Sequence, residues 1–581
     1  MTISPRKIYI TARPYTFRIL WSISGGFAAL LLLNNRNLLM YGGSANDYYI
    51  AWLAAVVVLG SLAYLALSFI FKKVHYPFYL TSRYLEFLRI FLTISFLAIH
   101  GLLLYKKGLG PIKVHYELTF VALATLIAAY TTWMCFGLMF KAIHRLVRFM
   151  KFTKEDRWVI LAFTACSALT SIFINLLTSV FYQYDKIFSL DTGHQLKTDI
   201  INNTYSSYTG IRHIGESVMT APLGALATPL RNVFWFIPHG EHLIILASFS
   251  LLIVVSSVLT VRMLQLKDRL YRLSFHLLYL LSFPVLIFSS MFEQYVPSVF
   301  FTILFVFFIW TYQKKRSSVD YTAIPRPQHK LVAIVSMVLS GMGVLTSFFA
   351  GLLFIRRGIK PTLVSLSTIV LVAILFVLAS GQLLTVAFGL QEYAALKSFM
   401  SLELGERINI YSHFLTNTIT NTSMYLGDIP YGSGVGVIDS PSLPSQLNPY
   451  GIVLLTCSIT GVVIGIRQKN PLFYVSGLWV ILSVIIIIGF GWGATNNEST
   501  LYTYYFSFAF IAGMFNLYLS LSNFASRKYG ISKRLSGWLL LAIVIIISYV
   551  NITQFTRIID FGTTHYPVDM RKFIRHEASP N

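Results

Sequence analysis

Long runs of apolar residues separated by short polar connectors dominate the chain. A helix needs about 20 apolar residues to cross the hydrocarbon core of a bilayer. Thirteen windows meet or approach this length: about 18–34, 50–71, 89–105, 117–140, 158–182, 243–261, 273–291, 296–312, 362–385, 450–466, 473–491, 501–521 and 535–552. The pattern therefore predicts an all-α fold, a polytopic transmembrane helical bundle of about thirteen spans.

One further apolar stretch, 331–355, does not fit this simple alternation. Lys330 and Arg356–Arg357 flank it, so both of its ends favour the cytoplasm. The stretch is too short for two full crossings, and Gly341–Gly343 interrupts it. It is predicted to form a re-entrant or broken hairpin; one straight span is the alternative.

Composition supports a membrane protein and argues against a soluble one. Hydrophobic residues make up 56% of the chain and charged residues 12%, whereas soluble domains carry roughly 25% charged residues. The formal net charge is +24, but the basic residues lie in the short connectors. That distribution is typical of topology determinants, so no nucleic-acid partner is expected. The three cysteines lie in apolar runs and lack metal-binding spacing.

The basic connectors also predict the orientation of the spans. With the N-terminus cytoplasmic, 32 of the 46 Lys and Arg residues fall on the cytoplasmic side. The C-terminus is then extracytoplasmic, and the basic start followed by an apolar run predicts a retained signal anchor. Under this topology 17 of the 22 acidic residues face outward. Acid-dependent chemistry is therefore expected on the outer face of the membrane.

The same topology divides the chain into segments. We expect an N-terminal four-span unit, a core with a long outer loop at 183–242, a second long outer loop, a C-terminal group of spans and an outer tail. These segments are 1–157, 158–385, 386–449, 450–553 and 554–581.

The two long outer loops are the largest polar regions. In the first, Ser217–Trp235 is apolar but interrupted by Pro222 and Pro229, which predicts helices lying in the plane of the interface. The second opens with a helix-like segment around Glu392–Tyr411 and then becomes rich in Asn, Thr, Gly and Pro, as turns and loops are. Gly432–Gly436 is not a dinucleotide fingerprint, because no strand is expected before it and no suitable helix after it.

Several segments at the outer ends of spans resemble the GT-C superfamily of membrane glycosyltransferases. The first outer loop resembles a GT-C catalytic loop, with an acid soon after a span and a later small-Pro-Leu segment. The segments that carry the resemblance are Phe188–Ile200, Arg212–Leu230, Phe292–Phe301 and Gly491–Phe506. The acid follows the fifth span here and the first span in the family, and the short first outer loop also contains an acid, so both loops stay candidates.

The resemblance implies inverting transfer of a sugar from a polyprenyl-phosphate donor to a cell-envelope glycan or lipid acceptor on the extracytoplasmic face. A carboxylate would take the proton of the acceptor hydroxyl. The candidate catalytic residues are Asp191, Asp199 and Asp47. The candidate phosphate- or substrate-binding residues are Arg212, His213, Glu216, Arg231, Glu293, Glu498 and Tyr502. The alternative is that these are ordinary solvated loop residues or snorkelling cations.

Partners and rival functions follow from the same pattern. The expected partners are the polyprenyl-phosphate sugar, the lipid bilayer and the acceptor; no cofactor is certain, and a divalent cation stays open. The first rival is a transporter or lipid-linked oligosaccharide flippase, which would normally place ionisable groups near mid-membrane. The second rival is an oligosaccharide polymerase or ligase, in which outer Arg and His residues would matter more than carboxylates.

Overall fold

A computed structural model describes residues 87, 90, 94, 147–183, 186–188, 240–291, 295–315, 403–422, 424–428, 435–439, 448–484, 488–489 and 499–568. The chain forms two compact units, one of Met1–Phe152 with Ile374–Ala387 and one of Thr153–Ala373 with Phe388–Asn581. All helices and strands named below belong to the second unit. The stretch 331–355 and the segment Ser217–Trp235 lie outside the described residues.

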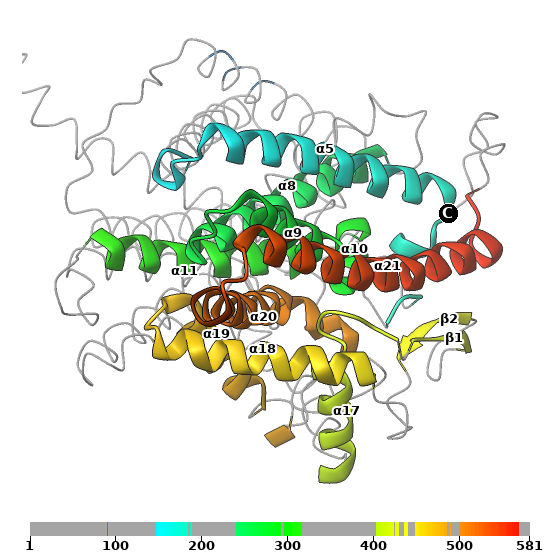
Figure 1. Ribbon diagram of the computed structural model, residues 1–581. Helices are drawn as coiled ribbons and strands as arrows, with labels where there is room; N and C mark the ends of the chain where they lie inside the picture. The colour runs from blue at the N-terminus through cyan, green and yellow to red at the C-terminus, as the bar shows by residue number, and fades with distance from the viewer. Residues whose placement is uncertain are drawn as a thin grey trace, which may run out of the picture. The chain divides into compact units, whose positions relative to one another are not determined.

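The second unit is mainly helical (Figure 1). Its α-helices are α5 (Lys154–Leu177), α8 (Gly240–Met263), α9 (Arg269–Leu280), α10 (Phe283–Ser290), α11 (Tyr295–Lys315), α17 (Leu404–Thr416), α18 (Pro449–Arg467), α19 (Pro471–Val484), α20 (Ser499–Tyr529) and α21 (Lys533–His565). A short 3-10 helix (Val180–Tyr182) follows α5. The strands β1 (Met424–Asp428) and β2 (Val435–Asp439) form an antiparallel hairpin.

Five helices are long and apolar enough to cross a membrane: α5, α8 over Ile245–Met263, α18, α20 over Thr503–Tyr529, and α21. Each coincides with a predicted window. The outward faces of α5 and α21 expose large apolar side chains, among them Trp158, Phe173, Trp538 and Ile546. Water would penalise so much exposed apolar surface, whereas lipid chains would not. The structure therefore fits a membrane-embedded helical protein.

The predicted number of spans is not supported. The described residues hold five such helices, or up to six if α9 and α10 form one bent span, rather than thirteen. The window 273–291 is broken into α9 and α10, which are bent by 60°. Helix α11 (Tyr295–Lys315) covers the window 296–312, although its described apolar part, Tyr295–Leu304, is too short to count as a span. In 473–491, α19 has 14 residues. Of the remaining five windows, the structure describes only Ile90 and Ile94.

A buried non-helical segment that follows α17 packs at the break between α9 and α10. Asn417, Thr418, Ile419, Thr420 and Asn421 are each at most 3% exposed, although the sequence predicts an outer loop here. The amide of Phe283 donates to the carbonyl oxygen of Ile419 at 3.1 Å. The structure therefore replaces missing helical hydrogen bonds with tertiary ones, as non-helical backbone in a membrane requires.

Polar side chains satisfy the other carbonyl groups of this segment. The Asn448 amide donates to the carbonyl oxygen of Thr420 at 3.0 Å, and the Ser507 hydroxyl donates to that of Thr418 at 2.9 Å. The Asn551 amide reaches the carbonyl oxygen of Leu281 at 3.0 Å. These contacts join α10, α18, α20 and α21 around the break.

Glycine allows α18 and α20 to approach backbone to backbone. A Cβ atom built on Gly461 would lie 1.7 Å from the carbonyl oxygen of Gly513, and one on Gly513 would lie 2.4 Å from that of Ser458. The Asn516 amide then donates to the carbonyl oxygen of Gly461 at 2.9 Å. Small residues at such a contact are typical of helix packing in membranes.

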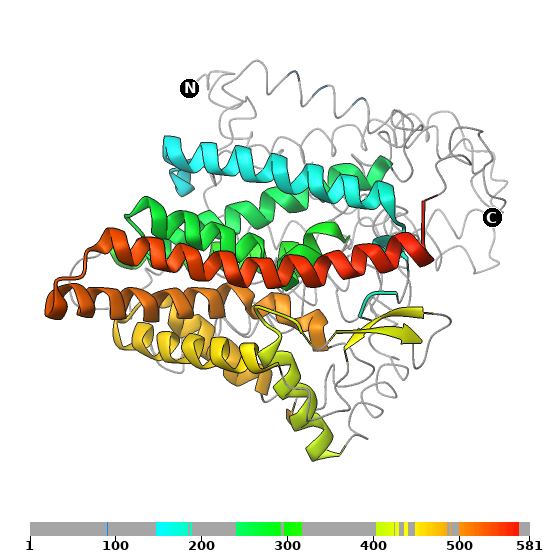
Figure 2. The same ribbon diagram turned by 45° about the vertical axis from the view of Figure 1, so that its right-hand side comes forward.

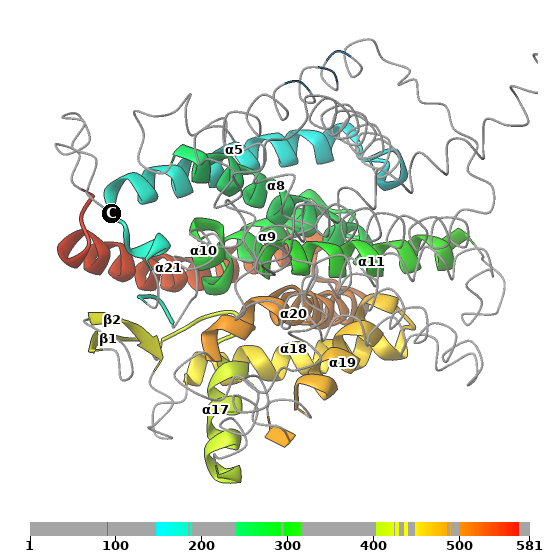
Figure 3. The same cartoon turned by 180° about the vertical axis from the view of Figure 1, so that it is seen from behind.

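The long helices of the second unit run side by side, so that this unit has two ends (Figure 2). At one end Glu155 pairs with Arg272 at 2.5 Å and Arg269 at 3.4 Å, and Asn470 donates to the carbonyl oxygen of Met263 at the end of α8. We call this the basic end. The opposite end, which we call the hairpin end, carries β1 and β2 (Figure 3). There the ends of α5 and α21 meet through a bridge between Thr178 and Pro567.

The long loop 386–449 is only partly as predicted. Its helix α17 ends at Thr416, overlaps the predicted helical segment and runs across the direction of α18 (Figure 1), as a membrane-parallel helix would. Arg407 of α17 donates to the carbonyl oxygens of Ile488 and Gly489 at 3.3 and 3.1 Å. The β-hairpin was not predicted. Strand β1 precedes Gly432–Gly436 in the chain, contrary to the prediction, and Val435 and Gly436 themselves begin β2, so no helix follows directly.

Candidate functional site

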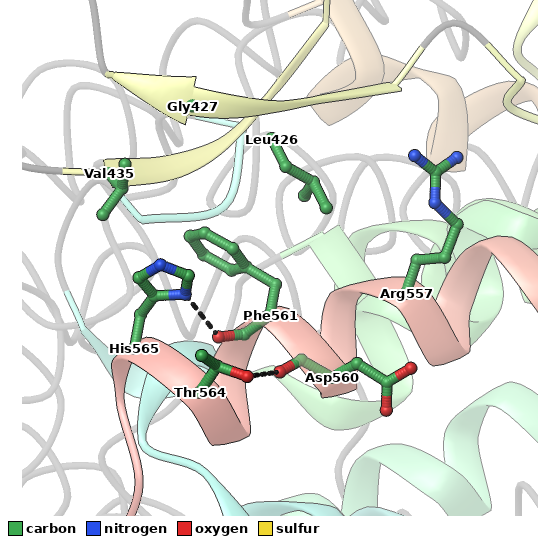
Figure 4. Close-up of a pocket in the computed structure, with 8 residues that line it drawn as sticks. All are labelled: Leu426, Gly427, Val435, Arg557, Asp560, Phe561, Thr564 and His565. Atoms are coloured by element: carbon green, nitrogen blue, oxygen red, sulfur yellow. Dashed lines mark hydrogen bonds between the residues drawn. The ribbon is translucent and has the colours of Figure 1, made fainter.

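A groove of about 400 Å³ lies at the hairpin end, between the β-hairpin and the last turns of α21 (Figure 4). The hairpin contributes apolar side chains and backbone, and α21 contributes most of the polar groups. The lining residues are Leu426, Gly427, Val435, Arg557, Asp560, Phe561, Thr564 and His565. The groove therefore combines an apolar wall with a guanidinium, a carboxylate and an imidazole.

Helical spacing brings the α21 residues to one face. Arg557 lies three residues before Asp560 and eight before His565, and such offsets recur on one side of an α-helix. The large exposed apolar side chains of α21 end at Ile552. The groove begins about one turn later, where the helix surface changes from apolar to polar. It is thus placed to receive an amphiphile with a polar head and an apolar tail.

The imidazole of His565 is held in one orientation. Its Nδ1 lies 3.1 Å from the backbone carbonyl oxygen of Phe561, and its ring stacks on that of Phe561 at 4.5 Å between centroids. A carbonyl oxygen only accepts hydrogen bonds, so the contact needs a proton on Nδ1. In the neutral ring Nε2 then carries the lone pair and can accept a proton or hydrogen bond.

Arg557 and Asp560 line the same groove without neutralising each other. Arg557 donates to the side-chain oxygen of Gln554 at 3.0 Å, and Figure 4 shows the guanidinium and the carboxylate pointing in different directions. Among the residues that the structure describes, no ion pair joins them. Both charges can therefore act on a bound molecule. The guanidinium can donate two hydrogen bonds to phosphate oxygens, and the carboxylate can accept a proton.

Tyr566 fixes the hairpin relative to α21. Its hydroxyl donates to the carbonyl oxygen of Val435 at 2.5 Å, and its own carbonyl oxygen accepts from the backbone N–H of Ser179 at 2.9 Å. A Cβ atom on Gly562 would lie 2.6 Å from the Thr178 hydroxyl oxygen, so α21 packs tightly on the end of α5. The groove is thus formed by elements from three distant parts of the chain.

The chain after α5 pairs with β2 through an isolated parallel bridge between Ile187 and Val437. Phe188 donates its N–H to the carbonyl oxygen of Val437 at 2.7 Å, and Val437 donates to that of Lys186 at 2.8 Å. Phe188 and Val437 are buried. Asp191 follows Phe188 by only three residues, a reach of about 11 Å for an extended chain. The predicted catalytic loop therefore starts at the same end as the groove.

Most residues predicted for the site cannot be placed. Asp47, Asp191, Asp199, Arg212, His213, Glu216, Arg231, Glu293 and Glu498 lie outside the described residues. Tyr502 belongs to the first turns of α20, and its side chain lies outside the described part. The described residues that line the groove therefore leave the predicted site untested.

The groove residues Arg557, Asp560 and His565 were missed by the sequence reasoning. The apolar window there ended at 552, and the following residues were assigned to an outer tail, whereas α21 continues to His565. The signal was present in the sequence as helical spacing of Arg557, Asp560 and Phe561 after the apolar run. Among the described residues, no group of three or more His, Cys, Asp or Glu side chains is arranged to hold a metal ion.

Comparison with models of protein families, with curated proteins and with solved structures found no match to the chain.

Proposed function

We propose that the protein is a membrane glycosyltransferase of the GT-C type, which moves a sugar from a polyprenyl-phosphate donor to a cell-envelope glycan or lipid acceptor. The observation that carries this proposal is the groove at the hairpin end, where charged groups begin as the apolar surface of α21 ends. A polyprenyl-phosphate sugar has the matching chemistry, because its apolar chain ends in a phosphate and a sugar.

Each polar group of the groove has a role in this reaction. The Arg557 guanidinium binds the phosphate oxygens of the donor and stabilises the charge that develops on them as the phosphate leaves. Asp560, or Asp191 from the adjoining loop, takes the proton of the acceptor hydroxyl. Nε2 of His565 accepts a hydrogen bond from a sugar or acceptor hydroxyl and orients it.

The transfer exchanges one bond for another at the anomeric carbon. The acceptor oxygen forms a bond to this carbon from one face while its proton passes to the carboxylate. The bond between the carbon and the carrier phosphate breaks on the opposite face, and the phosphate keeps the electron pair. Configuration at the carbon inverts, and no gradient or nucleotide is consumed.

The proposal includes an orientation. Cytoplasmic connectors of membrane proteins are enriched in Lys and Arg, which assigns the basic end to the cytoplasm and the hairpin end to the extracytoplasmic side of a plasma membrane. The N-terminus is then cytoplasmic and the C-terminus extracytoplasmic. Lipid-linked sugar donors would reach the groove from the outer leaflet.

The test uses purified full-length protein in detergent and a radiolabelled polyprenyl-phosphate sugar with a glycolipid acceptor. We expect release of polyprenyl phosphate without any ion gradient. Loss of a general base lowers a rate by about 10²–10⁴, so Asp560→Asn or Asp191→Asn should cause such a loss. Asp428→Asn, on the hairpin but outside the groove lining, is the matched control and should retain activity. If Asp560→Asn, Asp191→Asn and Asp199→Asn all retain full activity, the proposed carboxylate chemistry is wrong.

Variants at the same residues distinguish the glycosyltransferase from an oligosaccharide polymerase or ligase. That class is expected to depend more on cations and imidazoles than on a carboxylate base. Activity that survives Asp560→Asn and Asp191→Asn but is abolished by Arg557→Gln and His565→Gln would favour it.

A transporter or flippase is a second candidate, favoured by the broken span. Transporters form binding sites from interrupted helices, and the break between α9 and α10 is of this kind. Protein reconstituted into liposomes with a fluorescent lipid-linked sugar would then move the label between leaflets. Movement without sugar transfer, sensitive to changes at the break and insensitive to Asp560→Asn, would favour this candidate.

A further inference from the structure

The turn between α20 and α21 concentrates positive charge at the basic end. Arg527 and Lys528 lie in the last turn of α20, and Lys533 and Arg534 lie in the first turn of α21. We call these four residues the basic turn. The nearest acidic residues along the chain are Glu498 and Asp560. The basic turn therefore has no sequence neighbour that could neutralise it.

The turn is short, so the four cations lie close together along the backbone. Gly530 has a φ of 67°, the left-handed conformation that commonly ends a helix. The hydroxyl of Ser532 then caps α21 by accepting from the N–H of Leu535 at 3.1 Å. One turn inside, the hydroxyls of Ser536 and Ser522 are hydrogen-bonded at 2.7 Å and link the two helices.

The carboxylates of the basic end are engaged elsewhere. Glu155 pairs with Arg269 and Arg272, Asp156 caps α5 by accepting from the N–H of Thr153 at 2.9 Å, and Asp268 caps α9 by accepting from the N–H of Leu270 at 2.8 Å. Within the part of the chain that the structure describes, no carboxylate pairs with the basic turn. Its charge is therefore available to an external anion.

Aromatic and apolar side chains surround the cations. Phe524, Tyr529, Leu535 and Trp538 each expose more than half of their surface. The ammonium of Lys528 lies over the rings of Phe524 and Tyr529, at 5.5 and 5.4 Å from their centroids. Aromatic rings favour the headgroup level of a bilayer, and Lys and Arg stems extend along apolar surface to reach phosphates. This mixture suits a lipid headgroup better than a soluble anion.

We propose that the basic turn binds the phosphate headgroups of anionic phospholipids in the leaflet at the basic end. The cations bind the phosphate oxygens, while the exposed aromatic and apolar side chains contact the glycerol backbone and upper acyl chains. This inference is independent of the proposed glycosyltransferase activity, because it concerns the opposite end of the molecule and needs no turnover.

The test is a titration of purified full-length protein, in neutral detergent, with fluorescent phosphatidylglycerol and separately with fluorescent phosphatidylcholine. Wild-type protein should bind phosphatidylglycerol at least tenfold more tightly. In K533Q/R534Q, the loss of two cations should weaken phosphatidylglycerol binding by about 20- to 30-fold. High salt should produce a similar loss in the wild type, because screening weakens exposed charge interactions.

Two control variants keep the result interpretable. K154Q/R157Q removes the same number of charges from the basic end, outside the basic turn, and should bind as the wild type does. K533R/R534K keeps the charge and should also retain binding, with thermal unfolding monitored for all variants. Equal binding of both lipids by the wild type, or equal losses in K533Q/R534Q and K154Q/R157Q, would overturn the proposal.

Discussion

The side-chain amide of Asn551 donates a hydrogen bond to the backbone carbonyl oxygen of Ile419 at 3.1 Å, although the two residues lie 132 positions apart in the chain. Asn551 is fully buried and lies within the longest described helix. Its second donor reaches Leu281 at the break between α9 and α10. One asparagine thus serves two carbonyl groups that lack helical partners.

We predict that Asn551→Ala lowers the free energy of unfolding by about 1–3 kcal/mol, because the carbonyl group of Leu281 loses the amide donor and that of Ile419 keeps only the N–H of Phe283. The measurement is thermal or denaturant unfolding of the purified protein in detergent. Thr553→Ala is the control: its hydroxyl is exposed and bonds only within its own helix, so the change should stay within about 0.5 kcal/mol. Equal stability of the two variants would contradict the role assigned to Asn551.

The close contact between α18 and α20 predicts that substitution of two glycines, Gly461 and Gly405, has very different effects on stability. Gly461→Ala places a methyl group against the backbone of Gly513 and should cost about 1–3 kcal/mol through forced separation of the helices. Gly405→Ala meets nothing within 4 Å and removes a glycine from helix α17, so it should be neutral or slightly stabilising. Unfolding midpoints of the two variants, measured side by side, provide the check.

The fixed ring of His565 predicts which substitution preserves function. The side-chain NH2 of asparagine, a donor, can approximate Nδ1–H, and the side-chain oxygen of glutamine, an acceptor, can approximate Nε2. If Nε2 contacts the substrate, His565→Gln should retain more transfer activity than His565→Asn. Transfer rates at saturating donor, together with unfolding temperatures to exclude a folding defect, distinguish the two. A greater loss in the glutamine variant would show that Nδ1 and its contact with Phe561 matter more.

The proposed orientation predicts opposite labelling of the two ends. In a background without the three native cysteines, Thr564→Cys should react with a membrane-impermeant maleimide in intact cells. Ser532→Cys, at the basic turn, should react only after the membrane is permeabilised. The reverse pattern would place the groove inside the cell and exclude an extracytoplasmic transferase.

The existence of the apolar helices could be predicted from the sequence, but their ends and interruptions could not. Hydropathy finds α5, α18 and α21, because lipid exposure requires a long apolar run. The apolar window ends at 552, whereas α21 continues to His565, because the residues after 552 form an amphipathic helical segment without a continuous apolar run. Hydropathy also treats 273–291 as one span, although Pro284 lacks an amide hydrogen and disfavours helix in the residue before it. Pro284 is thus a local signal for the break.

The burial of segment 417–421 could not be predicted from its own residues. Its Asn and Thr residues resemble a solvated loop, and only the donors on distant helices make its burial favourable. The β-hairpin is similar, since its pairing with Lys186–Phe188 depends on chain that lies about 250 residues earlier. In both cases the interaction partners lie far away in the chain, so the local sequence does not reveal them. The helical spacing of the groove residues on α21 was visible in the sequence, but their placement against the hairpin depends on the same kind of long-range contact.

The contact between the residues that follow α5 and the end of α21 also has a consequence for folding during synthesis. The Thr178 hydroxyl donates to the carbonyl oxygen of Tyr566 across a separation of 388 residues. During synthesis α5 is complete long before α21 leaves the ribosome, so this contact closes one of the longest loops in the chain. The groove can therefore form only after the last helix has inserted, and a chain truncated before α21 would lack it altogether.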